Sequence, residues 1–233
     1  MKVRKGPLLV LIMIALLSAS LTLPSHTALA KDEDNGMIQR GQTGYAFVNF
    51  HDLNDKLVNK GYEGFKSNIF LTGGSGFFEI SDNFRLGGAG YQGSTTNSFA
   101  NGNGKLSLNF FGVLFEAGMD VTERFTLMAG ATAGTGTIGL RITESIPDSF
   151  DDALTDTPKR HKMDKRYFGI QPSLTMEFAV TSSISLRTSA SYLWGTANKW
   201  NLDGKKFIGP IKQVNAPIIT FGIHFGGNGK DEE

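Results

Sequence analysis

Apolar and small or polar side chains alternate without a break through residues 167–180. One face carries only apolar residues: Phe168, Ile170, Pro172, Leu174, Met176, Phe178 and Val180. The other face carries mostly small or polar residues: Tyr167, Gly169, Gln171, Ser173, Thr175, Glu177 and Ala179. A period of two predicts a β-strand with one face against an apolar environment. The strand is much longer than the about 5 to 6 residues that are usual in globular proteins.

The same alternation recurs and predicts eight strands. They cover residues 43–50, 67–80, 83–96, 104–120, 124–142, 166–181, 183–197 and 212–226. Tight turns at 81–83, 121–123 and 181–183 alternate with long connections at 51–66, 97–103, 143–165 and 198–211. Up-and-down strands with this rhythm collect the tight turns at one end and the long loops at the other, as transmembrane barrels do. The chain is therefore predicted to be all-β, an eight-stranded antiparallel up-and-down transmembrane β-barrel with short turns at one end and long loops at the other.

Two local features are expected within this pattern. Pro172 and Pro217 cannot donate a ladder hydrogen bond, so we expect bulges there. The first long connection predicts a short helix from Asp52 to Lys60, with Asp52 as its N-cap and Gly61 just beyond its end.

The first thirty residues have the three parts of a secretory signal peptide. Basic residues at positions 2, 4 and 5 precede an apolar run at 8–17, and Ala28-Leu29-Ala30 fits a cleavage site. The apolar run is shorter than the about 20 residues of a transmembrane helix. We predict export to a bacterial outer membrane, or alternatively to the periplasm or the medium. The predicted segments are a signal peptide at 1–30, a flexible segment at 31–42, a β-barrel domain at 43–226 and a polar tail at 227–233.

Composition removes several classes of function. The chain has no cysteine, which excludes disulfides and cysteine-bound metal clusters. Its formal net charge is +1, so nothing suggests a nucleic-acid partner. Residues 88–93 spell G-x-G-x-x-G, but no helical pattern follows to receive a pyrophosphate. We expect no cofactor and no metal.

Taken together, the signal peptide, the strands and the loop rhythm resemble the small eight-stranded outer-membrane β-barrel proteins of bacteria, in the porin-like superfamily. That resemblance implies an assembly signal in the last strand, which Thr220, Gly222 and Phe225 match. Gly227 stands where the final aromatic residue would be. The resemblance implies two partners, membrane lipid and the barrel-assembly machinery.

Aromatic residues are expected in two girdles at the membrane interfaces. One girdle, near the tight turns, has Phe78, Phe84, Phe125 and Phe178. The other, toward the long loops, has Tyr91, Tyr167, Phe168, Tyr192 and Trp194.

Charged residues on the inward faces fall at one level of the predicted barrel. They are Glu79, Arg85, Glu116, Glu177, Arg187 and His224. Eight strands enclose a lumen that side chains nearly fill, and a buried charge must be paired. We expect a salt-bridged network that closes the lumen, with a gate in a narrow pore as the alternative.

The longest connection is acidic in its first half and basic in its second. The basic residues are Lys159, Arg160, Lys162, Lys165 and Arg166. A solvated loop explains this pattern, and contact with lipid head groups or an unidentified surface ligand is the sharper hypothesis.

The predicted function is structural or based on surface interaction, and no enzyme activity is expected. Three alternatives remain: a narrow small-solute channel, a soluble secreted barrel that binds an apolar ligand, and a lipid-modifying enzyme of the outer membrane. The last would rely on serine, histidine and carboxylate, yet His51, His161 and His224 have no evident local serine partner.

Overall fold

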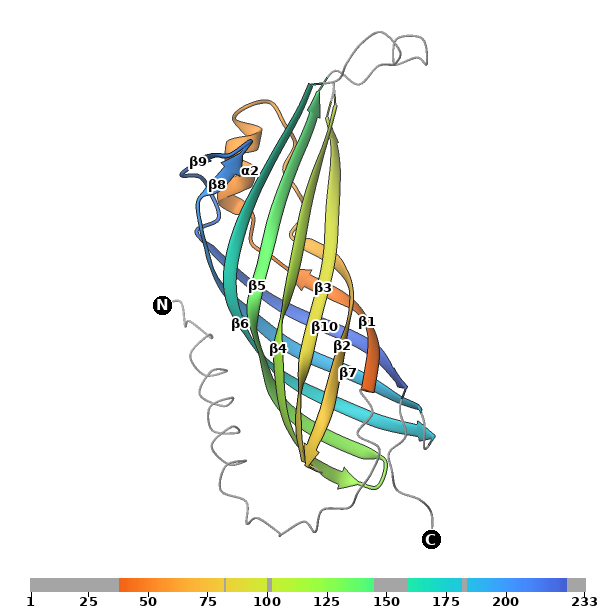
Figure 1. Ribbon diagram of the computed structural model, residues 1–233. Coiled ribbons are helices and arrows are strands. Elements are labelled where there is room, and N and C mark those ends of the chain that lie inside the picture. Colours follow the sequence, from red (N-terminus) through yellow and green to blue (C-terminus); the bar gives the residue numbers. More distant parts are fainter. Residues whose placement is uncertain (1–37, 82, 100–101, 145–158, 182–183, 226–233) are drawn as a thin grey trace, which may run out of the picture.

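The computed structural model describes residues 38–81, 83–99, 102–144, 159–181 and 184–225. Nearly all of them are in strands (Figure 1). The long strands are β1 (Ile38–Phe47), β2 (Asn68–Ser81), β3 (Phe84–Phe99), β4 (Gly102–Thr122), β5 (Phe125–Glu144), β6 (Lys159–Thr181), β7 (Ile184–Ala197) and β10 (Gln213–Phe225). The shorter elements are α2 (His51–Val58), β8 (Trp200–Leu202) and β9 (Lys205–Phe207).

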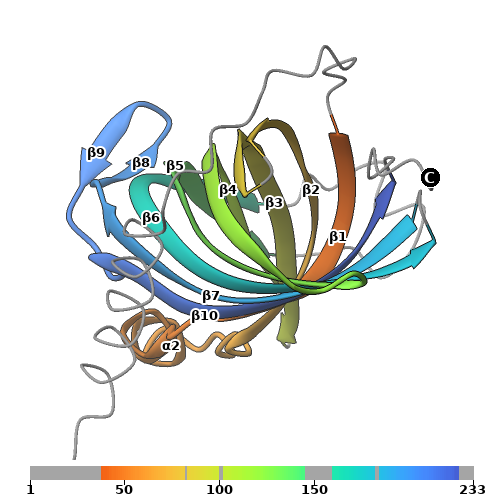
Figure 2. The ribbon, with the colours of Figure 1, turned by 90° about the horizontal axis from the view of Figure 1, so that it is seen from below.

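The eight long strands form one closed antiparallel ring. Neighbours along the chain pair with each other, β5 pairs with β6, and β1 pairs with β10 to join the two ends of the barrel. Seen from below, the strands curve around one interior (Figure 2). The eight-stranded up-and-down barrel predicted from the alternation is confirmed.

The barrel is much taller on one side than on the other (Figure 1). Strands β3 to β6 have 16, 21, 20 and 23 residues, whereas β1, β2, β7 and β10 have 10 to 14. We call the upper part of β3–β6 the wall. Its strands run further than predicted, because β5 and β6 stay paired up to Glu144 and Lys159. Residues 143–144 and 159–165, which were expected in a long connection, therefore lie in strands.

Two segments pack against the inner face of the wall, and we call residues 48–67 and 198–212 the cover. The first contains α2, whose buried Leu53 and Leu57 join the same apolar cluster as Leu106 and Leu140 of the wall. The second contains the β8–β9 hairpin. The tall side of the barrel thus encloses an apolar core where the short strands have already ended.

The helix begins at a different residue from the one predicted. It begins at His51 with Phe50 at the N-cap position, and no side chain caps it, so Asp52 lies in the first turn instead. Phe50 itself is buried in the apolar cluster. Gly61 has a positive φ of 82° just beyond the end, as its predicted role requires.

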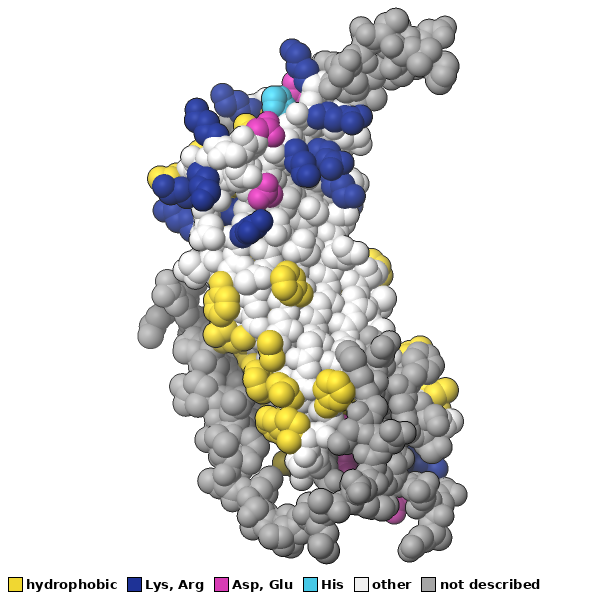
Figure 3. Space-filling view, viewed as in Figure 1, with side chains coloured by type: hydrophobic (Ala, Val, Ile, Leu, Met, Phe, Trp, Pro, Cys, Tyr) yellow, Lys and Arg dark blue, Asp and Glu magenta, His cyan; other side chains and the backbone are white. Residues whose placement is uncertain are grey.

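Alternation along each strand sends one set of side chains outward. The outward set forms an apolar belt around the lower barrel, which includes Tyr45, Phe70, Phe78, Phe111, Val113, Phe115, Phe168, Ile170, Leu174, Met176, Phe178, Leu186, Ile219, Phe221 and Ile223. Figure 3 shows part of this belt, with Lys and Arg gathered above it near the top of the wall. The outward placement of the apolar face predicted for 167–180 is confirmed.

The prediction of bulges at the two prolines is wrong. Register shifts occur instead at the three tight turns, between Glu79 and Ser81, Asp120 and Thr122, and Ala179 and Thr181. The ladder accommodates the prolines because Pro172 falls in a gap of the β6–β7 pairing and Pro217 lies beyond the last β1 partner.

The first strand also begins earlier than expected. It starts at Ile38, inside the segment 31–42 that was expected to be flexible, because its early residues pair with both β2 and β10.

Candidate functional site

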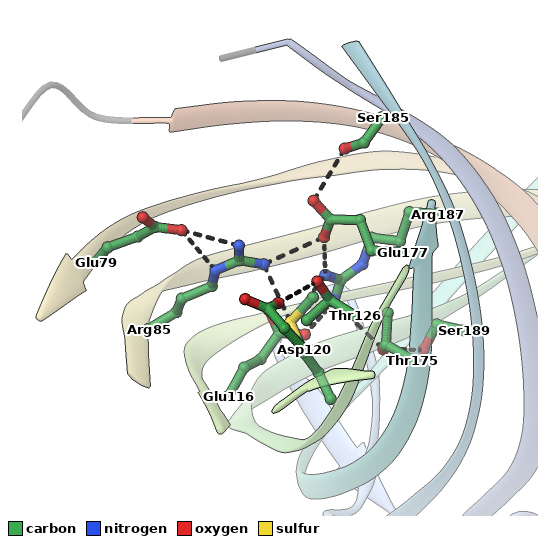
Figure 4. Close-up of polar contacts among 11 residues, drawn as sticks. Glu79, Arg85, Glu116, Asp120, Thr126, Thr175, Glu177, Ser185, Arg187 and Ser189 are labelled. Carbon is green, nitrogen blue, oxygen red and sulfur yellow. Dashed lines mark hydrogen bonds and ion pairs between the residues drawn. The ribbon is translucent and has the colours of Figure 1, made fainter. Parts of the chain in front are cut away.

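Five of the six predicted interior charges lie together near the tight-turn end of the barrel (Figure 4). We call them the interior charge cluster: Glu79, Arg85, Glu116, Glu177 and Arg187. Arg85 is the link on one side. Its Nη2 lies 2.8 Å from Glu79 Oε1, and its Nη1 lies 3.1 Å from Glu177 Oε2. The guanidinium also lies 4.9 Å from the ring centre of Phe77.

Arg187 is the link on the other side. Its Nη2 donates to Glu116 Oε1, and its Nη1 lies 3.5 Å from Glu177 Oε2. Nη2 also donates to Thr175 Oγ1 at 3.3 Å. Glu177 therefore joins both arginines, and its other oxygen accepts a bond of 2.9 Å from Ser185.

Cross-strand register places these residues at one level. Glu79 pairs with Arg85, Arg85 pairs with Glu116, and Glu177 pairs with Arg187. Glycines stand beside the long side chains in the same rows, because Gly130 pairs with Glu116 and Gly222 pairs with Arg187. A Cβ on Gly130 would lie 2.9 Å from Glu116 Cγ, so that glycine leaves room for the glutamate.

The charges of this cluster are buried, which strengthens the interactions between them. The side chains of Glu116 and Glu177 are 1% and 7% exposed, and those of Arg85 and Arg187 are nearly as buried. Glu79 is half-exposed at the open end. Carboxylates so far from water need cationic partners, and each has one here. His224 lies in β10, where its backbone pairs with Arg40 and Ser185, but its side chain is outside the described residues.

A small polar cavity of about 40 Å³ lies next to the cluster. Tyr91 and Gln171 lie on its lining, where the Tyr91 hydroxyl donates to Gln171 Oε1 at 3.1 Å. Gln171 in turn donates to Ser191 Oγ at 2.8 Å. The cavity has room for about three water molecules.

Aromatic rings fill the next level of the interior. The rings of Phe110 and Tyr167 stack at 6.1 Å, and Tyr91 lies 5.6 Å from Phe110. Tyr167 donates from its hydroxyl to the carbonyl of Asn109 at 2.7 Å. The assignment of Tyr91 and Tyr167 to an outer aromatic girdle is therefore wrong, because both are buried inside the barrel. The alternation along each strand could have shown this. Tyr91 lies on the same face of β3 as the inward Arg85, and Tyr167 lies on the same face of β6 as the inward Ser173.

The predicted lipid-facing cations divide into two groups. Lys159, Arg160, Lys162 and Arg166 are exposed. Lys165 differs from its prediction, because its side chain is 2% exposed and points toward the cover. The period of two explains this, since Lys165 shares its face with buried Tyr167.

Lys165 holds the second segment of the cover. Its Nζ lies 3.1 Å from the carbonyl oxygen of Pro210, which also accepts a bond of 2.8 Å from Trp200 Nε1. The ammonium lies 5.6 Å from the centre of the Trp200 ring. Ile211, the next residue, has a φ of +62°, which is a strained conformation for a β-branched side chain.

The β8–β9 hairpin was missed by the sequence reasoning although a signal was present. Asp203 and Gly204 both have positive φ and join two short apolar-containing strands. Asp-Gly is a strong signal for a two-residue hairpin turn.

The residues of the predicted assembly signal lie in β10. Thr220 is buried in the interior, and Gly222 pairs with Gln42 and Arg187. A Cβ on Gly222 would lie 2.7 Å from the carbonyl oxygen of Gly41, so close strand contact alone requires glycine there. The side chain of Phe225 is outside the described residues.

No constellation typical of catalysis is found in the part of the chain that the structure describes. His51 lies 3.4 Å from Asp55 on the exposed face of α2, and His161 is exposed on β6. Within the same described residues, no three metal-ligating side chains come together. Among these residues, none of the helices is long and apolar enough to cross a membrane.

Comparison with known proteins finds similarity in fold. No family model and no curated protein sequence matches the chain. Solved structures that are similar include the attachment invasion locus protein Ail of Yersinia pestis, with 15% identity, a TM-score of 0.40 and coverage of 82% of this chain and 99% of that one. Neisserial surface protein A is 12% identical, with a TM-score of 0.46 and coverage of 82% and 96%. The N-terminal β-barrel domain of Pseudomonas aeruginosa OprF is 15% identical, with a TM-score of 0.34 and coverage of 81% and 97%. The chain thus resembles small outer-membrane β-barrel proteins in its fold.

Proposed function

We propose that this chain is a bacterial outer-membrane β-barrel protein with a structural or surface-interaction role and a closed lumen. One observation carries the membrane part of the proposal. On β4 and β6 the apolar belt ends at Phe111 and Phe168, which share one cross-strand row through Thr135 of β5. Above this row the outward side chains on these strands are polar, charged or glycine. A common upper edge of the belt on β4 and β6 is what a flat bilayer surface requires.

The direction of insertion follows from the unequal ends. Outer-membrane barrels keep short turns in the periplasm and longer segments outside. The wall and the cover would therefore face the surroundings. Residues 1–30 would direct export, and Thr220, Gly222 and Phe225 would present β10 to the barrel-assembly machinery.

Three interior levels support a lumen that does not conduct. The interior charge cluster, the stacked rings of Phe110 and Tyr167, and the apolar core under the cover follow one another along the barrel. The purified protein should give no conductance in planar bilayers. Discrete channel currents in the wild type, lost on neutralisation of Arg187, would favour the channel alternative instead.

Membrane insertion is tested with one substitution inside the belt and one above it. Leu174 lies midway along the outward apolar face of β6, between Phe168 and Val180. Leu174→Arg should abolish or weaken insertion, since an arginine near the bilayer midplane costs about 2–4 kcal/mol. Asn103→Arg, on the outward face of β4 above the belt, is the matched control and should insert normally.

The measurement is a gel shift on boiling, made on protein extracted from outer-membrane fractions. Wild type and Asn103→Arg should shift only after heating, and Leu174→Arg should lose the folded band. A soluble wild-type protein without a heat-dependent shift would contradict the proposal and favour the soluble ligand-binding barrel.

The exposed cations above the belt suggest a membrane partner as well. Lys159, Arg160, Lys162 and Arg166 would lie close to the head groups of the outer leaflet. Each basic side chain near an anionic surface contributes about 1 kcal/mol to attraction.

A further inference from the structure

The outward face of the wall carries a row of three cations in direct cross-strand register. Lys105 on β4 pairs with Arg141 on β5, and Arg141 pairs with Lys162 on β6. All three side chains are exposed. Within the described residues the structure records no ion pair for any of them. Like charges directly opposite one another destabilise a sheet, so this row is best satisfied by an external anion.

A hollow lies on the same face, between the cation row and the apolar belt. Its volume is about 500 Å³, and its lining includes Thr72, Gln92, Ser94, Ser107 and Asn109, with Lys105 and Phe70 at its margins. The lining is rich in hydroxyl and amide groups. Such groups bind sugar hydroxyls through neutral hydrogen bonds.

Side chains of three kinds therefore succeed one another up the outward face of β4. Phe111, which is 65% exposed, belongs to the belt. Asn109 and Ser107 follow at the hollow, and Lys105 stands above them. Positions 105 and 111 are separated by about 20 Å of strand. In Figure 3, a band with neither yellow nor dark-blue side chains separates the apolar surface from the cations on this face.

We propose that the outward face of the wall binds the phosphorylated saccharide head group of a glycolipid in the surrounding leaflet. The acyl chains would lie against the belt at Phe111, the sugars would occupy the hollow, and the phosphate would meet the row of Lys105, Arg141 and Lys162. An ordinary phospholipid fits less well, because only the short glycerol ester portion separates its phosphate from its acyl chains. This inference rests on the proposed membrane insertion and names the lipid that the inserted barrel would hold.

The test uses the full-length protein inserted in zwitterionic phospholipid nanodiscs, to which a bisphosphorylated glucosamine-disaccharide glycolipid is added. The triple variant Lys105→Gln, Arg141→Gln and Lys162→Gln removes the row. It should weaken binding roughly 10- to 100-fold, given the attraction of each cation for an anionic lipid surface. A dephosphorylated form of the same glycolipid should bind the wild type as weakly as the bisphosphorylated form binds the triple variant.

A matched control removes the same charge elsewhere. Lys199, Lys205 and Lys206 are exposed cations on the second segment of the cover. Their triple change to Gln should leave glycolipid binding unchanged. Equal losses in the two triple variants, or no loss in either, would overturn the proposal.

The hollow is tested separately through Gln92→Leu with Ser94→Val. This pair should remove the preference of the protein for the glycolipid over cardiolipin, a phospholipid that also carries two phosphates. Persistence of the preference would show that the hollow does not bind sugar. A soluble sulfated polysaccharide that binds more tightly than the glycolipid, through the same three cations, would also overturn the lipid assignment.

Heat-dependent gel shift of each variant separates the two proposals. A variant that inserts and shifts normally but keeps full glycolipid binding contradicts only this inference. A wild type that does not insert contradicts the proposed function itself.

Discussion

The guanidinium of Arg187 on β7 reaches across the barrel interior to the carboxylate of Glu116 on β4, although β5 and β6 separate these strands in the sheet. The contact therefore ties opposite sides of the ring together. Both side chains are nearly inaccessible to water. The loss of either partner would leave the other charge buried without a counterion, which strongly destabilises a folded protein.

Replacement of Arg187 by methionine should strongly destabilise the barrel. It leaves Glu116 buried without its cation, and removing one partner of a buried pair costs about 3 to 5 kcal/mol. Urea titration of the protein in lipid vesicles measures its free energy of unfolding. Arg166→Met, an exposed control on β6, should change it little. Addition of Glu116→Gln to Arg187→Met should recover part of the loss, and no recovery would contradict the role of the pair.

Gly136 should not tolerate alanine. A Cβ there would overlap both the carbonyl oxygen of Asn109 and the ring of Tyr167. Strands β4 and β5 would have to separate, at a cost of about 1–3 kcal/mol for an overpacked site. Gly41→Ala is the control, because its Cβ would meet nothing within 4 Å. Equal stability of the two variants in the same urea titration would show that this contact is not limiting.

The barrel was predictable because the period of two is a global signal. Each outward apolar face repeats over many residues, and a one-residue slip would reverse every face, so the register of charges such as Glu79 and Arg85 follows from the same pattern. For this reason, the level of the barrel at which Glu177 and Arg187 meet could be predicted from the sequence.

The upper half of the protein was not predictable in the same way. The outward face of β6 becomes charged above the belt, so residues 159–165 look like a loop although the strand begins at Lys159. Packing of Leu53 and Trp200 against the wall supports this extension. These are contacts between segments far apart in the sequence, and local pattern carries no information about them. Lys165 was misplaced because a basic run hides the alternation that turns one member inward.

Removal of Leu53 should loosen the cover without dissolving the barrel. Leu53→Ala empties part of the apolar cluster, and such changes cost about 2 to 5 kcal/mol. Hydrogen exchange should rise in residues 48–67, while the heat-dependent gel shift is retained. Val58→Ala, at a position 59% exposed on the same helix, should leave exchange unchanged. If residues 48–67 exchanged at the same rate in both variants, the stability of the helix would not depend on its packing against the wall.

Lys165→Met should stabilise the protein at neutral pH, and the gain should shrink in alkali. Lys165 lies in the wall above the belt, and its burial lowers the pKa of its ammonium below the usual 10.5. The unfolded chain therefore binds more protons than the folded one between the lowered pKa and 10.5. In that window the wild type gains stability as the pH rises, whereas the methionine variant has no such dependence. Trp200 still donates to the carbonyl of Pro210 in the variant, so that oxygen keeps a partner. Urea titrations at pH 7 and near pH 10 measure the difference, with exposed Lys162→Met as the control. A gap between wild type and Lys165→Met that widens with pH would contradict the burial of a charged lysine as its cause.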